Sequence, residues 1–145
     1  MLSQKAKYAL KAMLALAAEK DGDLLQAGDI ATKHNVPRKF LELILLDLRK
    51  QGLINSQRGK NGGYALAKPA EAITFGQIVR IMDGPLAPIP CASLTGYRRC
   101  EDCRDEKTCA VRRTMREVRD AAATILDGMT LAQARQGAGR KMPVL

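Results

Sequence analysis

The four cysteines of this 145-residue chain lie together in one short stretch, at Cys91, Cys100, Cys103 and Cys109. This stretch contains few large apolar residues, so it needs a cross-link or an inorganic centre to hold a shape. Soft thiolate ligands suit zinc or an iron–sulfur cluster. One Cys-x-x-Cys pair flanked by two single cysteines is less typical of a zinc ribbon and favours an iron–sulfur site. Thiol redox chemistry and four inert thiols stay open as alternatives.

The charge balance predicts a polyanionic partner. The chain has 24 Lys and Arg against 15 Asp and Glu, a formal net charge of +9, and the excess is larger in the N-terminal half. No signal peptide is visible and no apolar run is long enough to cross a bilayer. We therefore expect no membrane association and a cytoplasmic location, where thiols stay reduced.

Helical periodicity dominates the first third of the chain. Apolar residues at three- and four-residue steps predict a helix over residues 3–20. A short helix over residues 28–34 and a longer one over residues 37–51, joined by a tight turn, form a helix-turn-helix candidate. The buried side of the longer helix is predicted to consist of Phe40, Leu41, Ile44, Leu45 and Leu48.

The next segment predicts a two-stranded ribbon. Residues 53–57 and 64–67 read as strands, and residues 58–63 form a glycine-rich turn between them. A helix-turn-helix followed by such a ribbon is a winged helix, and we expect it to bind double-stranded DNA. The predicted fold class is therefore mainly α with a small β-wing.

The predicted DNA contacts lie at the start of the longer helix and at the tip of the wing. Arg38 and Lys39 could read guanine or grip phosphate, because the start of a recognition helix usually faces base edges. Glu42 could accept from cytosine N4 or pair with a cation in its own helix. At the wing we expect Arg58 and Lys60 to contact the duplex, and glycines such as Gly62 to let the backbone approach it.

A linking helix is predicted from Thr74 to Gly84. After the last cysteine, apolar residues step by four and three along a long helix over residues 110–127. The seam consists of Val111, Met115, Val118, Ala122, Ile125 and Met129. Arginines cover the other face, at positions 112, 113, 116 and 119.

Such a narrow seam needs a second helix against it. A homodimer is expected over packing within one chain, because winged-helix regulators commonly read the two half-sites of a palindromic operator. The chain then divides into four parts. They are a winged helix (1–70), a linking helix with the cysteine loop (71–109), a dimerisation helix (110–129), and a short helix with a basic tail (130–145).

These motifs together resemble the Rrf-two family of winged-helix transcriptional regulators. Residues 2–10, 48–54 and 78–84 are similar to family segments, and so, more specifically, is the wing sequence Arg58-Gly59-Lys60-Asn61-Gly62-Gly63-Tyr64. The resemblance covers about residues 1–130. It implies a sequence-specific DNA-binding regulator, expected to be a repressor, and not an enzyme.

The resemblance also bears on the cysteines. Cluster-binding members hold a 2Fe–2S or 4Fe–4S cluster with three cysteines between the linking and dimerisation helices, and Cys91, Cys103 and Cys109 fall at those places. Members that complete the site with a histidine have it where this chain has Arg112, and members that use an acid have it where this chain has Lys7.

The resemblance therefore implies that Cys100 is the fourth ligand of an all-thiolate site, and that the cluster modulates DNA binding. Two other functions are weighed against this one. The first is a zinc-stabilised or thiol-redox regulator without a cluster. The second, an iron–sulfur electron carrier, is disfavoured because it would leave the wing without a use.

Overall fold

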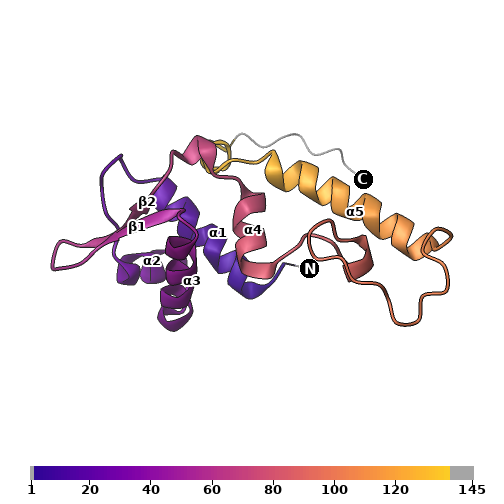
Figure 1. Ribbon diagram of the computed structural model, residues 1–145. Coiled ribbons are helices and arrows are strands. Elements are labelled where there is room, and N and C mark those ends of the chain that lie inside the picture. The colour runs from indigo at the N-terminus through magenta and orange to yellow at the C-terminus, as the bar shows by residue number, and fades with distance from the viewer. Residues whose placement is uncertain (1, 138–145) are drawn as a thin grey trace.

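The computed structural model describes residues 2–137, in which a winged helix carries a long protruding helix and a loop (Figure 1). The helices are α1 (Gln4–Ala17), α2 (Ala27–His34), α3 (Arg38–Lys50), α4 (Phe75–Asp83), α5 (Ala110–Asp127) and α6 (Leu131–Arg135). Two short 3-10 helices are η1 (Ala70–Ala72) and η2 (Pro90–Ala92), and the strands are β1 (Ile54–Gln57) and β2 (Gly63–Leu66). The predicted fold class is confirmed. The predicted basic tail over residues 136–145 lies outside the described residues from residue 138 on.

The core of the winged helix forms where α1, α2 and α3 meet. Its fully buried side chains include Met13, Ile30, Leu41, Ile44 and Leu48. The helix α1 is capped by Ser3, whose hydroxyl accepts a hydrogen bond from the Ala6 amide at 3.0 Å. It ends at Ala17, short of the predicted residue 20.

The turn between α2 and α3 sets the angle of the recognition helix. Asn35 ends α2 in the left-handed conformation with φ of 53°, which few residues other than glycine and asparagine adopt readily. The next residue, Val36, is buried, and Pro37 directly precedes α3. The buried Val36 thus anchors the turn before α3 against the core.

The position predicted for Phe40 is wrong. Its side chain is 57% exposed, and its ring lies 6.4 Å from the ring of Tyr8 on α1, outside the core. The other four residues of the predicted buried side, Leu41, Ile44, Leu45 and Leu48, are buried as expected. Successive residues of a helix point in directions about 100° apart, so Phe40, directly before the buried Leu41, lies at the edge of the buried face.

The wing is an antiparallel ribbon in which Ile54 pairs with Leu66 and Gln57 with Gly63. The ribbon is fixed close to its turn, because Tyr64 and Leu25 exchange two backbone hydrogen bonds, of 2.8 and 3.0 Å. The turn that contains Arg58 and Lys60 therefore projects from an anchored part of the ribbon.

The helix α4 links the winged helix to α5. Thr74 and Gln77 form a capping box at its start. Near the end of α4, Arg80 donates to both carboxylate oxygens of Asp127, the last residue of α5, at 2.6 and 2.9 Å. These hydrogen bonds raise the pKa of Arg80 and lower the pKa of Asp127, so the pair is charged at neutral pH.

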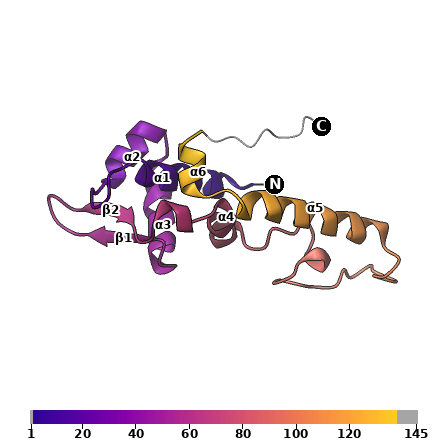
Figure 2. The same ribbon diagram turned by 90° about the horizontal axis from the view of Figure 1, so that it is seen from above.

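The C-terminal end of α5 is tied back to the winged helix by α6. Leu131 is fully buried, and its amide donates to the Ile73 carbonyl at 2.9 Å. Both ribbon views show α5 extending from this attachment away from the wing, with the loop before it alongside (Figures 1 and 2). The structure thus places the cysteine loop far from the wing and in contact with α5.

Candidate DNA-binding surface and cysteine site

The start of α3 presents its charged side chains to solvent. Arg38 Nε lies 3.3 Å from Glu42 Oε1, in an ion pair one helical turn long whose side chains are 70% and 58% exposed. The structure contains the pairing with a cation that was considered for Glu42, and its contact with cytosine stays a prediction. Lys39 is exposed beside them.

A groove between α3 and the wing gathers further cations. Arg58 and Lys60 are exposed at the wing tip and line this groove together with Arg49. Arg49 Nη1 donates to Ser56 Oγ at 3.0 Å, which holds this arginine between the recognition helix and β1. Sequence analysis missed Arg49, although its place in the last turn of α3, just before the wing, was a usable signal.

Gly62 lies in the turn of the wing, as predicted, where a side chain would not fit. A Cβ atom there would lie 2.2 Å from the Gln57 carbonyl oxygen and 2.9 Å from the Arg58 carbonyl carbon. Gly62 is also buried, so its missing side chain is required by the folding of the turn itself. Its expected role in close approach to a duplex stays a prediction.

Within the cysteine loop, two sulfur atoms lie close together. Cys91 in η2 is buried, and Cys100 Sγ donates a hydrogen bond to Cys91 Sγ over 3.7 Å. This hydrogen bond raises the pKa of the Cys100 thiol. All four cysteines are free thiols.

The other two cysteines are placed separately. Cys103 follows a turn in which its amide donates to the Cys100 carbonyl at 3.3 Å. Cys109 caps α5, and its sulfur accepts from the Arg112 amide at 3.4 Å. Within residues 2–137 no three Cys, His, Asp or Glu side chains are gathered in a metal-binding arrangement. The structure therefore brings together Cys91 and Cys100 but not the complete predicted set.

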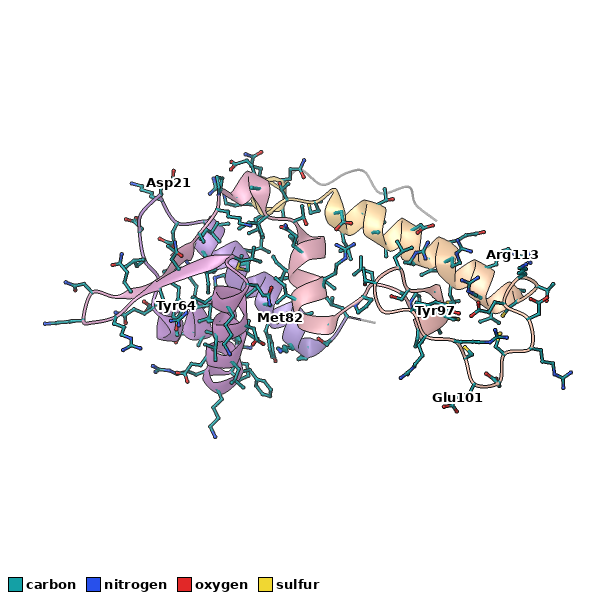
Figure 3. The ribbon with its side chains drawn as sticks, in the orientation of Figure 1. Asp21, Tyr64, Met82, Tyr97, Glu101 and Arg113 are labelled. Carbon is teal, nitrogen blue, oxygen red and sulfur yellow. The ribbon has the colours of Figure 1, made fainter. Side chains whose placement is uncertain are left out.

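Two arginines of α5 hold the first cysteine's segment. Arg112 Nε donates to the Cys91 carbonyl at 3.0 Å, and Arg119 Nη1 donates to the Ala92 carbonyl at 2.6 Å. Arg119 is only 9% exposed and also pairs with Asp120 at 2.7 Å. Arg119 was expected on the face of α5 away from the seam, and there its side chain is buried because it reaches back to η2. In Figure 3, Tyr97, Glu101 and Arg113 mark this outer part of the molecule, well away from Tyr64 at the wing.

Replacing Arg119 with Leu is expected to loosen the cysteine loop. The Ala92 carbonyl would lose a charged donor in a buried place, which costs about 1.5–3 kcal/mol. Thermal unfolding and limited proteolysis between residues 91 and 109 would show the loss. Arg116→Leu, at an exposed position of the same helix, is the matched control. Equal cleavage rates in the two variants would contradict a holding role for Arg119.

The apolar seam of α5 is largely uncovered in the described chain. Val111 is 62% exposed, Val118 46% and Ile125 48%. Large apolar residues at regular heptad spacing are rarely left in water on a monomer. The seam is therefore available to a second helix. No helix within residues 2–137 combines the length and the apolar character needed to cross a membrane.

Known proteins match the chain over most of its length. The Rrf2 family profile, described as an iron-dependent transcriptional regulator, matches residues 2–136. An HTH-type transcriptional regulator of Rhodobacter capsulatus named rrf2-like is 46% identical over 134 residues, which are 90% of this chain and 89% of that protein.

Two solved structures are also similar. CymR, the global cysteine regulator of B. subtilis, has a TM-score of 0.78 and 32% identity, covering 94% of this chain and 96% of its own. IscR of T. potens has a TM-score of 0.73 and 26% identity, covering 100% of this chain and 93% of its own. The named relatives are regulators of transcription and not enzymes, as expected for this chain.

Proposed function

Because the chain belongs to the Rrf2 family of transcriptional regulators, we propose that it represses transcription as a homodimer on a palindromic operator. We propose further that an iron–sulfur cluster held by Cys91, Cys100, Cys103 and Cys109 modulates its binding to DNA. The working compartment is then the cytoplasm, where the thiols stay reduced.

The DNA-binding part of this proposal is supported by the charges on one surface. Arg49 at the end of α3 and Arg58 and Lys60 on the wing are cations around a single groove. Lys39 is exposed in the first turn of α3. A recognition helix with a basic wing beside it suits a major groove flanked by phosphates. The uncovered seam of α5 supports the homodimer.

The chemistry of the four thiols fits a cluster, since thiolates are the usual ligands of 2Fe–2S and 4Fe–4S centres. A bound cluster would supply iron–thiolate bonds that respond to redox state or to iron supply. The separate positions of Cys103 and Cys109 imply that the loop must close for all four cysteines to bind. The chain has neither the histidine nor the acid that the resemblance offers as a substitute ligand, so Cys100 completes the set.

The single observation that carries the regulatory proposal is the attachment of the cysteine loop to α5. Arg112 links the Cys91 carbonyl to the helix whose seam would pair in a dimer. Two recognition helices must lie about 34–36 Å apart to read successive major grooves. A change in the loop could therefore alter this spacing, with a coupling of about 1–3 kcal/mol.

Anaerobic purification followed by visible absorption and by iron, sulfide and zinc analysis tests this proposal. We expect iron and sulfide in the wild type, and loss of both in Cys→Ala variants at each of the four positions. Thr95→Ala, on an exposed part of the same loop, is the control that should keep the centre. Retention in Cys100→Ala would remove Cys100 from the ligand set, and zinc without sulfide would support a zinc-stabilised regulator.

A second function is favoured by the separation of 3.7 Å between Cys91 Sγ and Cys100 Sγ. Hydrogen peroxide could accept two electrons and two protons from this thiol pair, forming one disulfide and two water molecules. The matching readout is an intact protein two hydrogens lighter after peroxide treatment, restored by a dithiol. Under this function, an operator would be bound differently by the reduced and the oxidised apo-protein.

A further inference from the structure

The recognition helix α3 exposes apolar residues that its core does not need. Leu43 is 62% exposed and Leu46 is 41% exposed, on the side opposite the buried Leu41, Ile44 and Leu48. Both lie near the middle of the helix.

These leucines belong to one ridge with a charge at each end. Lys39, Leu43, Leu46 and Lys50 follow one another at steps of four, three and four residues, so they lie along one face of α3. All four are exposed. We call this set the outer ridge. It is the part of α3 that first meets any partner approaching the helix from solvent.

Charge decides which partner suits this ridge. Both acids of α3 are engaged, because Glu42 pairs with Arg38 at 3.3 Å and Asp47 pairs with Lys5 at 2.9 Å. The net charge of the chain is +9. A second copy of the chain would therefore bring cations against cations here, whereas a polyanion would be attracted.

A polyanion that covers two leucines must itself carry apolar groups. In the major groove of DNA the apolar group presented by the base pairs is the C5-methyl of thymine. The lysines at the ends of the ridge would reach the phosphates on either side of the groove, while the leucines face its floor. Burial of a methyl group against a leucine is then worth about a fourfold gain in affinity.

We propose that Leu43, with Leu46 beside it, determines operator specificity by contacting thymine methyl groups under the middle of α3. This rests on the proposed binding of α3 in the major groove. Each half-site should therefore contain one or two thymines whose methyl groups are required. Lys39 and Lys50 would contribute affinity that is independent of these methyls.

Deoxyuridine in place of thymine removes the methyl group and nothing else, so it tests this proposal directly. An operator is first obtained by in-vitro selection with the full-length protein, and the dissociation constant is then measured by fluorescence anisotropy. Replacing thymidine by deoxyuridine at one or two positions of each half-site should weaken the binding of the wild-type protein to this operator by about threefold to tenfold per position.

Leu43→Ala should bind the thymine operator more weakly by a similar factor and should no longer distinguish thymine from deoxyuridine at the same position. Because Leu43 is exposed, this variant should keep its fold, which thermal unfolding checks. Lys39→Ala is the matched control: it should bind both duplexes more weakly and keep their ratio.

Equal wild-type affinity for the two duplexes would overturn the proposal, and so would a Leu43→Ala variant that keeps full discrimination. A change of oligomeric state in Leu43→Ala with unchanged DNA binding would assign the ridge to a second copy and also overturn it. Failure of the selection to yield any bound operator would instead count against the proposed DNA-binding function, so the two failures are distinguishable.

Discussion

The double replacement Arg58→Ala and Lys60→Ala is expected to weaken operator binding by about 30- to 1,000-fold, equivalent to about 2–4 kcal/mol. Both cations are exposed at the tip of an anchored hairpin, and neither forms a salt bridge within the described part of the chain. Their charge is therefore available to DNA. Arginine at a wing tip can enter a groove, and lysine can neutralise a phosphate.

The salt dependence of operator affinity shows whether the double variant binds more weakly because it has lost phosphate contacts or because the wing has changed its conformation. If each cation contacts one phosphate, the slope of log affinity against log salt should fall by about one per residue removed. The matched control is Lys107→Ala with Arg113→Ala, which removes the same charge from the outer end of the molecule. Wing and control variants with the same affinity would mean that the field of the whole chain, and not the wing, attracts DNA.

Much of this surface was predictable because its signals are local. Asn35 and Pro37 fix the turn before α3, and the glycine-rich tip of the wing fixes the hairpin. Such positions depend on backbone geometry within a few residues. Sequence analysis placed Arg38, Lys39, Arg58 and Lys60 correctly on an exposed surface for that reason.

Positions that depend on distant partners were harder to predict. Phe40 is apolar and was predicted on the buried side of its helix, yet it is 57% exposed at the edge of the core beside Tyr8. Arg119 is in phase with the outer arginines, yet it is buried because η2 supplies the Ala92 carbonyl. Neither partner can be identified from helical periodicity alone.

The cysteine loop shows the same limit. The composition of the loop identifies a thiol-rich site, but the distances between its sulfur atoms depend on how the loop folds against α5. The separation of 3.7 Å between the sulfurs of Cys91 and Cys100 depends on the burial of η2 and on Arg112. Spacing along the sequence contains no information about those contacts.

Val118→Glu is expected to convert the proposed homodimer to a monomer at micromolar concentration. In one chain Val118 is 46% exposed, so a glutamate there stays in contact with water and the monomer keeps its fold. In a dimer that pairs the seams of two α5 helices, the same carboxylate would be desolvated between apolar side chains. Burial of an unpaired charge costs several kcal/mol, so the dimer dissociation constant should rise by more than about a hundredfold.

Sedimentation velocity over a range of concentrations measures this change. Thr124→Glu adds the same charge to the opposite side of α5, and it should remain dimeric with unchanged thermal stability. The Val118→Glu monomer should also bind a palindromic operator far more weakly than the wild type does. Its two recognition helices are no longer linked, so binding of one half-site does not promote binding of the other. A Val118→Glu protein that still sediments as a dimer would show that the seam is not the dimer interface, and the coupling between the cysteine loop and α5 would then have to act within one chain.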